Sequence, residues 1–281
     1  MGSTTRDFPV GGLADRARAW LDGAGPDPVV PKAASTVMLV RNGAGDTGSA
    51  VEVFMLRRVA SMAFAPRMMV FPGGGVDVRD ADPQLPWAGP PPSVWATELG
   101  CDEDSARELV IAAVREVFEE CGVLLAGPDP HSVVADVRGA AWQEERAALL
   151  SRQTSLAQML IRRGLVLRSD LLSARAHWVT PEFEHRRYDT RFFAALMPEG
   201  QVADDLTSEA DHADWTDPAQ LLRDEAAGRA LMLPPTVVCV EEVARATSAA
   251  GFVAERVPVR PVVPVPARVG QDVVIRCELP R

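Results

Sequence analysis

The sequence carries the stretch Arg115-Glu116-Val117-Phe118-Glu119-Glu120-Cys121-Gly122-Val123 near its middle. Its glutamates are adjacent or three and four positions apart, so a helix would place all of them on one face. Carboxylates crowded in this way repel one another, and partial burial then raises a pKa or calls for a cation. The stretch therefore predicts the acidic half of a metal site. A solvated acidic helix face is the alternative.

The residues before this stretch predict the helix that carries it. Ser105 and Glu108 have the spacing of a capping box, which places the helix start just after Ser105. An apolar stripe follows at three- and four-residue steps, formed by Val110, Ala113, Val114, Val117 and Cys121. Gly122 is expected to end the helix, because glycine readily takes the left-handed conformation of a C-terminal cap.

A glycine-rich segment, Phe71-Pro72-Gly73-Gly74-Gly75, stands upstream and is expected to turn sharply. Glycines let the backbone approach another group closely and also permit positive φ angles. An ordinary tight turn has the same composition. Next to the acidic helix, however, Gly73 and Gly74 become candidates for substrate binding in a phosphate-chemistry site.

The composition limits the classes of partner and the cellular location that we expect. The chain has 281 residues, 47% of them hydrophobic, and a net charge of −10 with a single lysine, Lys32. This acidic balance argues against nucleic acid or an anionic membrane as a partner. No signal peptide and no run of eighteen apolar residues is found, and the four cysteines lack C-x-x-C spacing. A cytoplasmic protein with reduced thiols is therefore expected.

Hydrophobic patterns predict a mixture of strands and helices. Strands are expected at 34–40, 51–56, 68–71, 176–180, 187–196 and 272–278. Besides the acidic helix, helices are expected at 13–21, 142–150, 156–163, 217–222 and 235–246. This order lacks the regular alternation of a Rossmann fold and predicts an α+β fold, a mixed α/β/α sandwich.

We expect a single domain over residues 1–281 that carries two inserts. Prolines between residues 81 and 104 predict a loop, because proline disfavours regular structure in the middle of an element. Residues 128–170 predict a helical insert, and residues 256–281 an extended C-terminal tail.

These motifs resemble the signature box of the Nudix hydrolases, in which a glycine, five residues, a glutamate and seven residues precede Arg-Glu-(apolar)-x-Glu-Glu-x-Gly-(apolar). Arg115 to Val123 match the second half at every defined position. The first half departs from it: the fifth residue after Gly74 is followed by Asp80 instead of glutamate, and 27 extra residues separate Asp80 from Arg115.

The resemblance implies a Nudix fold and hydrolysis of a small-molecule diphosphate that requires Mg²⁺ or Mn²⁺. It assigns metal binding to Glu116, Glu119 and Glu120, and it makes Arg115 the arginine that orients them. The general base stays open between a box glutamate and a later acid. Glu120 lies nearest the apolar stripe, where burial would raise its pKa, and Glu209 is a further catalytic candidate.

The interrupted box resembles the mammalian peroxisomal coenzyme A diphosphatases. Shorter matches to that subgroup are Phe64-Ala-Pro66, His177-Trp178-Val179-Thr180-Pro181 and the segment from Arg187 to Phe193. This resemblance implies cleavage of coenzyme A or an acyl-CoA to 3′,5′-ADP and a phosphopantetheine derivative. Near the glycines, Arg57, Arg58 and Arg67 are candidates to bind the extra phosphate, with solvation of a strand end as the alternative.

Three alternatives accompany this interpretation. The enzyme could be a broader pyrophosphatase for ADP-ribose, NADH or a nucleotide sugar. A Nudix-fold binding module without catalysis is the rival from another class, although its acidic box would be expected to be broken. Homodimers are common in the family, and the Pro/Val-rich tail is a candidate surface for one.

Overall fold

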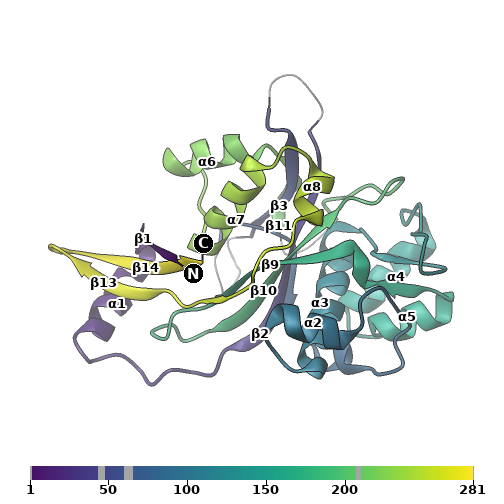
Figure 1. Ribbon diagram of the computed structural model, residues 1–281, viewed down its shortest axis with the longest axis horizontal. Coiled ribbons are helices and arrows are strands. Elements are labelled where there is room, and N and C mark those ends of the chain that lie inside the picture. Colours follow the sequence, from purple (N-terminus) through teal and green to yellow (C-terminus); the bar gives the residue numbers. More distant parts are fainter. Residues whose placement is uncertain (1, 44–47, 60–65, 207–209, 281) are drawn as a thin grey trace.

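The computed structural model describes residues 2–43, 48–59, 66–206 and 210–280, and it has an α+β architecture. A mixed eight-stranded sheet lies at its centre, with helices on both faces (Figure 1). The α+β sandwich predicted from the sequence is confirmed. The strands of this sheet are β2 (Lys32–Asn42), β3 (Val51–Arg58), β4 (Met69–Val70), β5 (Gly73–Gly75), β9 (Leu172–Val179), β10 (Tyr188–Leu196), β11 (Ala210–Thr216) and β12 (Pro261–Val262).

Strand β2 is the centre of the sheet. It runs parallel to β10 and antiparallel to β3 and β5. Its alternating side chains serve two cores, with Val37 and Leu39 on one face and Met38 and Val40 on the other. A strand that is apolar on both faces belongs inside a sandwich, which explains the continuous apolar run in the sequence.

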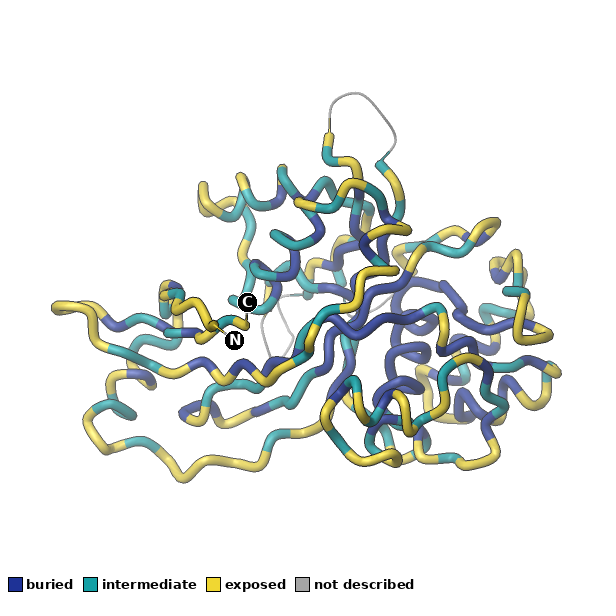
Figure 2. Tube along the Cα trace, viewed as in Figure 1, coloured by how far each residue is buried: buried dark blue, intermediate teal, exposed yellow. Residues whose placement is uncertain are grey.

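Helices cover each face of the sheet. The first core holds residues of α2 (Pro92–Leu99), α3 (Glu103–Cys121), α4 (Ala140–Leu150) and α5 (Leu156–Arg163). The second core holds residues of α1 (Ala14–Leu21), α6 (Pro218–Ala226), α7 (Pro234–Arg245) and α8 (Ala249–Ala254). Helix α3 is buried along most of its length (Figure 2).

Helix α3 begins earlier than the capping box at Ser105 indicates. Its N-cap is Asp102, whose carboxylate accepts hydrogen bonds from the backbone N–H and the hydroxyl of Ser105. Asp and Ser are both good N-caps, and here the aspartate caps the helix while the serine stands inside the first turn. At the other end Gly122, with φ of +66°, terminates the helix as expected.

The proline-rich segment expected to be a loop contains regular structure. Strand β6 (Trp87–Ala88) and helix α2 form within residues 81–104. The expectation failed because Pro92 stands in the first turn of α2, where its missing N–H costs nothing. Trp95 and Leu99 then anchor the helix in the first core.

The two inserts pair with each other. Strand β8 (Val166–Arg168), in the helical insert, runs parallel to β6 and antiparallel to β7 (Ala126–Gly127). This three-stranded sheet connects the segment inserted before α3 with the segment that follows it. The inserts therefore brace each other beside α3.

A third sheet joins segments from opposite ends of the sequence. It has the order β1 (Ser3–Pro9), β14 (Asp272–Pro280) and β13 (Val265–Val269), and all pairings are antiparallel. The extended character of residues 256–281 is seen in β12, β13 and β14, whereas the polar sequence of β1 gave no sign of a strand.

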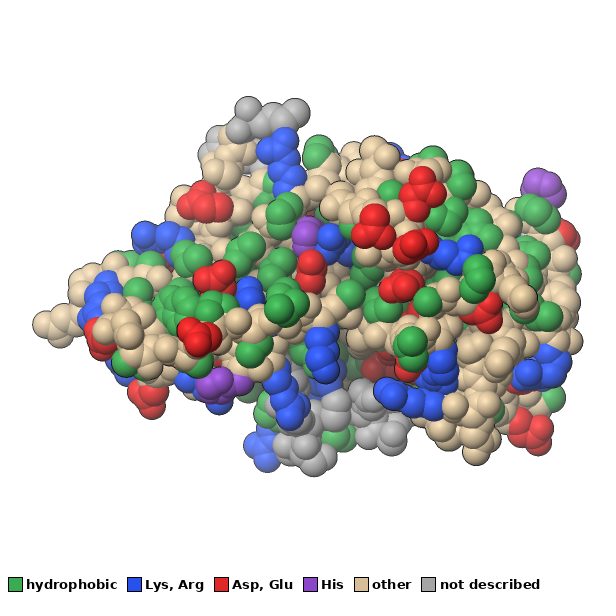
Figure 3. All heavy atoms as spheres, turned by 90° about the horizontal axis from the view of Figure 1, so that it is seen from below, with side chains coloured by type: hydrophobic (Ala, Val, Ile, Leu, Met, Phe, Trp, Pro, Cys, Tyr) green, Lys and Arg blue, Asp and Glu red, His purple; other side chains and the backbone are tan. Residues whose placement is uncertain are grey.

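The distribution of surface side chains and the lengths of the helices concern possible partners such as nucleic acid and membranes. Acidic, basic and apolar side chains are interspersed over the face seen in Figure 3. Within the described ranges, none of the helices is both long and apolar enough to span a bilayer.

Candidate functional site

The acidic face of α3 lies against β5. The backbone N–H of Gly73 donates a hydrogen bond to Oε2 of Glu120 at 2.7 Å. Gly73, Gly74 and Gly75 form a short strand that pairs with residues 34–36 of β2, so the glycines do not make the sharp turn expected for this segment, and the chain bends at Pro72 just before them. None of the three adopts a positive φ. The two halves recognised in the sequence are nevertheless in contact.

Close approach, rather than unusual backbone angles, is what requires glycine here. A Cβ on Gly74 would lie 2.5 Å from Oε1 of Glu116, and a Cβ on Gly73 would lie 2.5 Å from the backbone oxygen of Ser35. Both distances are shorter than Cβ atoms tolerate. Gly75 differs, because its nearest neighbour would be 3.9 Å away.

Arg115 is held between the box carboxylates. Its Nε and Nη2 donate to the two oxygens of Asp80 at 2.9 and 2.8 Å, and Nη2 also donates to the backbone oxygen of Gly75. Its Nη1 lies 2.6 Å from Glu116 and 3.5 Å from Glu119. Burial lowers the pKa of Arg115, but the bonds to Asp80 and the nearby carboxylates outweigh it and raise the pKa above its ordinary value.

Asp80, which departs from the signature, thus occupies a defined place. It is buried at the end of a short 3-10 helix, η2 (Val78–Ala81), and it accepts from the N–H of Asp77 in a capping box. The two parallel hydrogen bonds to Arg115 form a bidentate ion pair. Although the side chain of Asp80 is shorter than that of the glutamate in the signature, it contacts Arg115, from which the insert separates it in the sequence.

The three glutamates are buried, with Glu116, Glu119 and Glu120 only 9%, 8% and 4% exposed. Burial raises the pKa of Glu116 to about 7 against the opposing effect of Arg115, and burial likewise raises the pKa of Glu119. One arginine therefore does not fully compensate the acids, which is the condition under which a site favours an additional cation.

The donor set fits a hard divalent cation, which prefers oxygen ligands. Oε1 of Glu119 is buried and has no hydrogen-bond partner among the described residues. As the side chains stand, no three His, Cys, Asp or Glu groups in the described part of the chain are close enough together to hold a metal ion. Metal binding would therefore require the carboxylates to turn from Arg115 and Gly73 toward the ion.

The other predicted residues are placed as follows. Arg57 is exposed and pairs with Asp211 of β11 through a 2.6 Å contact. Arg58 and Arg67 are joined through their backbones, because the N–H of Arg67 donates to the backbone oxygen of Arg58. Glu209 lies outside the described residues, as do Phe64 and Ala65.

A groove of about 460 Å³ adjoins the site and joins the two inserts. It is lined by Val78, Arg79, Ala81, Asp82, Arg152, Gln153, Thr154, Ser155 and Gln158. Arg79 pairs with both oxygens of Asp77, and this hydrogen bonding, with a smaller contribution from nearby Glu119, raises the pKa of Arg79. No sequence pattern indicated Arg79 or Arg152, because Arg79 lies in the short 3-10 helix η2 and Arg152 lies in a turn.

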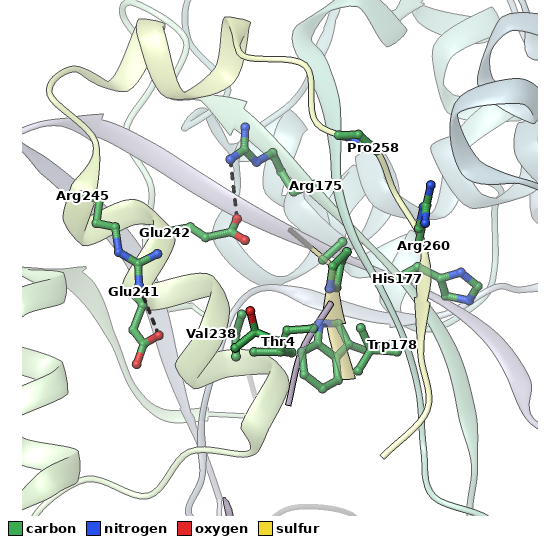
Figure 4. Close-up of a pocket in the computed structure, with 14 residues that line it drawn as sticks. Thr4, Arg175, His177, Trp178, Val238, Glu241, Glu242, Arg245, Pro258 and Arg260 are labelled. Carbon is green, nitrogen blue, oxygen red and sulfur yellow. Dashed lines mark hydrogen bonds and ion pairs between the residues drawn. The ribbon is translucent and has the colours of Figure 1, made fainter. Parts of the chain in front are cut away.

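A second cavity, of about 220 Å³, lies between β9, α7 and the terminal strands (Figure 4). Its charged residues largely neutralise one another. Arg175 pairs with Glu242 and Glu255, and Arg245 pairs with Glu241. We therefore place the functional site at α3, where the acids are undercompensated.

Comparison with known proteins identifies the family of the chain. The model of the NUDT19 Nudix domain family matches residues 96–245, more than half of the chain. A crystal structure of a Nudix hydrolase from Alicyclobacillus acidocaldarius superposes with a TM-score of 0.67 at 25% identity, covering 82% of this chain and 98% of that one.

Curated relatives include a protein named as a Nudix hydrolase and proteins named as acyl-coenzyme A diphosphatases. Nudix hydrolase 7 of Caenorhabditis elegans is 30% identical over 194 residues, which is 66% of this chain and 53% of that protein. The acyl-coenzyme A diphosphatase NUDT19 of Xenopus laevis is 24% identical over 217 residues, which is 66% of this chain and 57% of that protein. The chain thus spans about half the length of these relatives. On the family match and the structural similarity, the chain belongs to the Nudix hydrolases, in the NUDT19 Nudix domain family.

Proposed function

We propose that the protein hydrolyses the diphosphate bond of coenzyme A or an acyl-CoA in a reaction that depends on Mg²⁺ or Mn²⁺. The observation that carries the proposal is the buried acidic face of α3, with one unpartnered carboxylate oxygen, opposite the glycine strand β5. The choice of substrate is supported by the relatives named acyl-coenzyme A diphosphatase.

In this proposal Glu116, Glu119 and Glu120 hold the metal through carboxylate oxygens. The bound metal would polarise a phosphoryl oxygen and lower the pKa of a water molecule. Arg115 stays on Asp80 and keeps the first turn of the acidic face in place. Gly73 and Gly74 are our proposed contacts for a substrate phosphate, which could approach the backbone of β5 once Glu116 and Glu120 turn toward the metal.

A carboxylate must also accept the proton from the attacking water. We propose Glu120, which is the most buried of the three and is oriented by the N–H of Gly73. Glu209 is the alternative. Turnover that survives Glu120→Gln but not Glu209→Gln would assign the base to the later residue.

The groove between the inserts is our proposed place for the substrate arm beyond the diphosphate. Arg152 is 77% exposed there and only 3.7 Å from Asp77, so its guanidinium can turn toward an anionic group. Arg57, Arg58 and Arg67 remain proposed contacts for the extra phosphate of coenzyme A. Equal cleavage of coenzyme A and 3′-dephospho-CoA would contradict a role in reading that phosphate.

The decisive experiment is a substrate panel with Mg²⁺ or Mn²⁺, in which products are identified by mass spectrometry. Coenzyme A, an acyl-CoA, 3′-dephospho-CoA, ADP-ribose, NADH and a nucleotide sugar would be compared at equal concentration. We expect 3′,5′-ADP and a phosphopantetheine derivative as the main products. Preferred cleavage of ADP-ribose, NADH or the sugar would instead indicate the broader pyrophosphatase, and no cleavage of any compound would indicate a binding module.

A further inference from the structure

Arg146 connects the helical insert to the end of the acidic helix. It lies on α4 and is 2% exposed. Its Nε donates to the backbone oxygen of Glu119 at 2.8 Å, and its Nη1 pairs with Oδ1 of Asp204 at 2.6 Å. A charged side chain is expensive to bury unless it is paired, so a fully buried arginine at this position calls for an explanation.

Asp204 completes a cap on the same helix end. Its backbone N–H donates to the oxygen of Cys121 at 2.9 Å, while its carboxylate accepts from Arg146 and from the N–H of Leu206. The last four carbonyl groups of a helix lack partners within the helix. Here the oxygens of Glu119 and Cys121 obtain them from the insert and from the segment after β10.

The ion pair between Arg146 and Asp204 also lies close to Gly122. A Cβ on Gly122 would lie 2.7 Å from Oδ2 of Asp204 and 3.1 Å from Nη1 of Arg146. The glycine of the signature thus permits both the left-handed helix end and the close approach of the ion pair. Gln201 ties the same segment to the chain after the helix, because its side-chain amide bonds both the N–H and the oxygen of Leu124.

We propose that Arg146 and Asp204 are positioning residues that fix the C-terminal turn of α3, and with it the carboxylates of Glu119 and Glu120. Arg146 bonds the backbone of one of these glutamates directly. The arginine also places positive charge at a helix C-terminus, which favours the helical end state.

This inference rests on the proposed function, since it assigns a purpose to the helical insert in that same site. The insert would be a support of the metal-binding turn in addition to a wall of the groove. The T-shaped contact between Trp142 of α4 and Phe118 of α3 provides an apolar part of the same support.

The test compares Arg146→Met and Asp204→Asn with the wild-type chain. Mn²⁺ affinity is measured by electron paramagnetic resonance of the free ion, and kcat and KM with coenzyme A. We expect Arg146→Met to raise the Mn²⁺ Kd about tenfold, as loss of a residue that orients metal ligands typically does. We expect kcat to fall by about tenfold or more, because displaced catalytic groups lose rate steeply, while KM changes less than about twofold. Asp204→Asn should shift both quantities in the same direction by a smaller factor.

The control is Arg138→Met, an exposed arginine of the same insert that pairs with Asp136. Its Mn²⁺ Kd and kcat should match those of the wild type. Circular dichroism and thermal unfolding report the folded fraction, so that values are compared per folded molecule. Unchanged Kd and kcat in Arg146→Met, with stability alone reduced, would overturn the proposal. If Arg146→Met does not fold, a wild-type Mn²⁺ Kd in Asp204→Asn overturns it.

Mn²⁺ binding needs no substrate, which separates the two proposals. Failure of every compound in the substrate panel would contradict the proposed hydrolysis. The comparison of metal affinities would still test whether Arg146 and Asp204 position the acidic turn.

Discussion

Asp80 and Arg115 form a buried, bidentate ion pair, with hydrogen bonds of 2.9 and 2.8 Å, although 34 residues separate them in the sequence. The pair joins the start of the interrupted box to the middle of α3. It holds Arg115 where its remaining nitrogen can contact Glu116 and Glu119.

Asp80→Asn should destabilise the fold. The substitution removes the charge while preserving the size of the side chain, and it leaves Arg115 buried without its main partner. Breaking a buried pair in this way costs about 3 kcal/mol of the free energy of unfolding, which urea denaturation would measure. Asp136→Asn provides the control, because its exposed pair with Arg138 should contribute less than about 1 kcal/mol. Equal losses in both variants would contradict a structural role for the buried pair.

The three glycines of β5 should respond to alanine in a graded order. Gly73→Ala forces a Cβ against the backbone of Ser35, so it should cost about 1–3 kcal/mol. Gly74→Ala meets the carboxylate of Glu116, a movable group, and should cost less but disturb its bond to Arg115. Gly75→Ala makes only an ordinary van der Waals contact, 3.9 Å from the backbone oxygen of Ala33, and its free energy of unfolding should be unchanged or slightly raised. Urea denaturation of the three variants measures this order, and a Gly75→Ala loss as large as that of Gly73→Ala would contradict it.

Glu119→Gln should weaken metal binding. The variant neutralises the carboxylate whose Oε1 is unpartnered, so we expect the Mn²⁺ Kd to rise about 100-fold. Isothermal titration calorimetry would measure it. Glu103→Gln, in the exposed first turn of the same helix, is the matched control and should bind Mn²⁺ like the wild type. Unaltered binding in Glu119→Gln would remove this residue from the site.

Glu242 should make stability depend on pH. Burial raises its pKa above the ordinary value of 4.5, while Arg175 and Arg245 oppose the shift and Glu255 adds to it. The folded chain thus holds this proton more tightly than the unfolded chain. The contribution of Glu242 to stability is then fully present below pH 4.5 and is lost as the pH rises through the folded-state pKa.

We therefore expect the stability of the wild type, relative to Glu242→Gln, to decrease as the pH rises above 4.5. Urea denaturation of both chains across this range would measure the difference. A difference that stays constant with pH would contradict the prediction.

Local patterns predicted the acidic helix well because its signals are local. The apolar stripe and Gly122 are read within one helix, and α3 ends where they indicate. The start was misplaced because Asp102 and Ser105 are both competent caps, and only packing decides between them. Pro92 is ambiguous for a similar reason, since proline breaks a helix interior but suits a first turn.

Local sequence patterns do not predict contacts between residues that are far apart in the sequence. Nothing local in Ser3–Pro9 indicates pairing with a strand more than 260 residues away. The sequence weakly indicates that Arg146 is buried. It stands four residues after Trp142 and three before Leu149, on the buried face of α4. A charged residue at such a position signals a buried ion pair, but the sequence cannot name Asp204 as the partner.

The clamp between Asp80 and Arg115 also sets what the intervening chain is free to do. Once both ends of a segment are fixed, the entropy lost in closing it grows only slowly with length, by about 0.6 kcal/mol for each doubling. A segment anchored in this way can lengthen, shorten or acquire a helix such as α2 with little effect on the residues that anchor it. The interrupted box is thus a place where the chain can vary in length while the spacing of its acids is preserved.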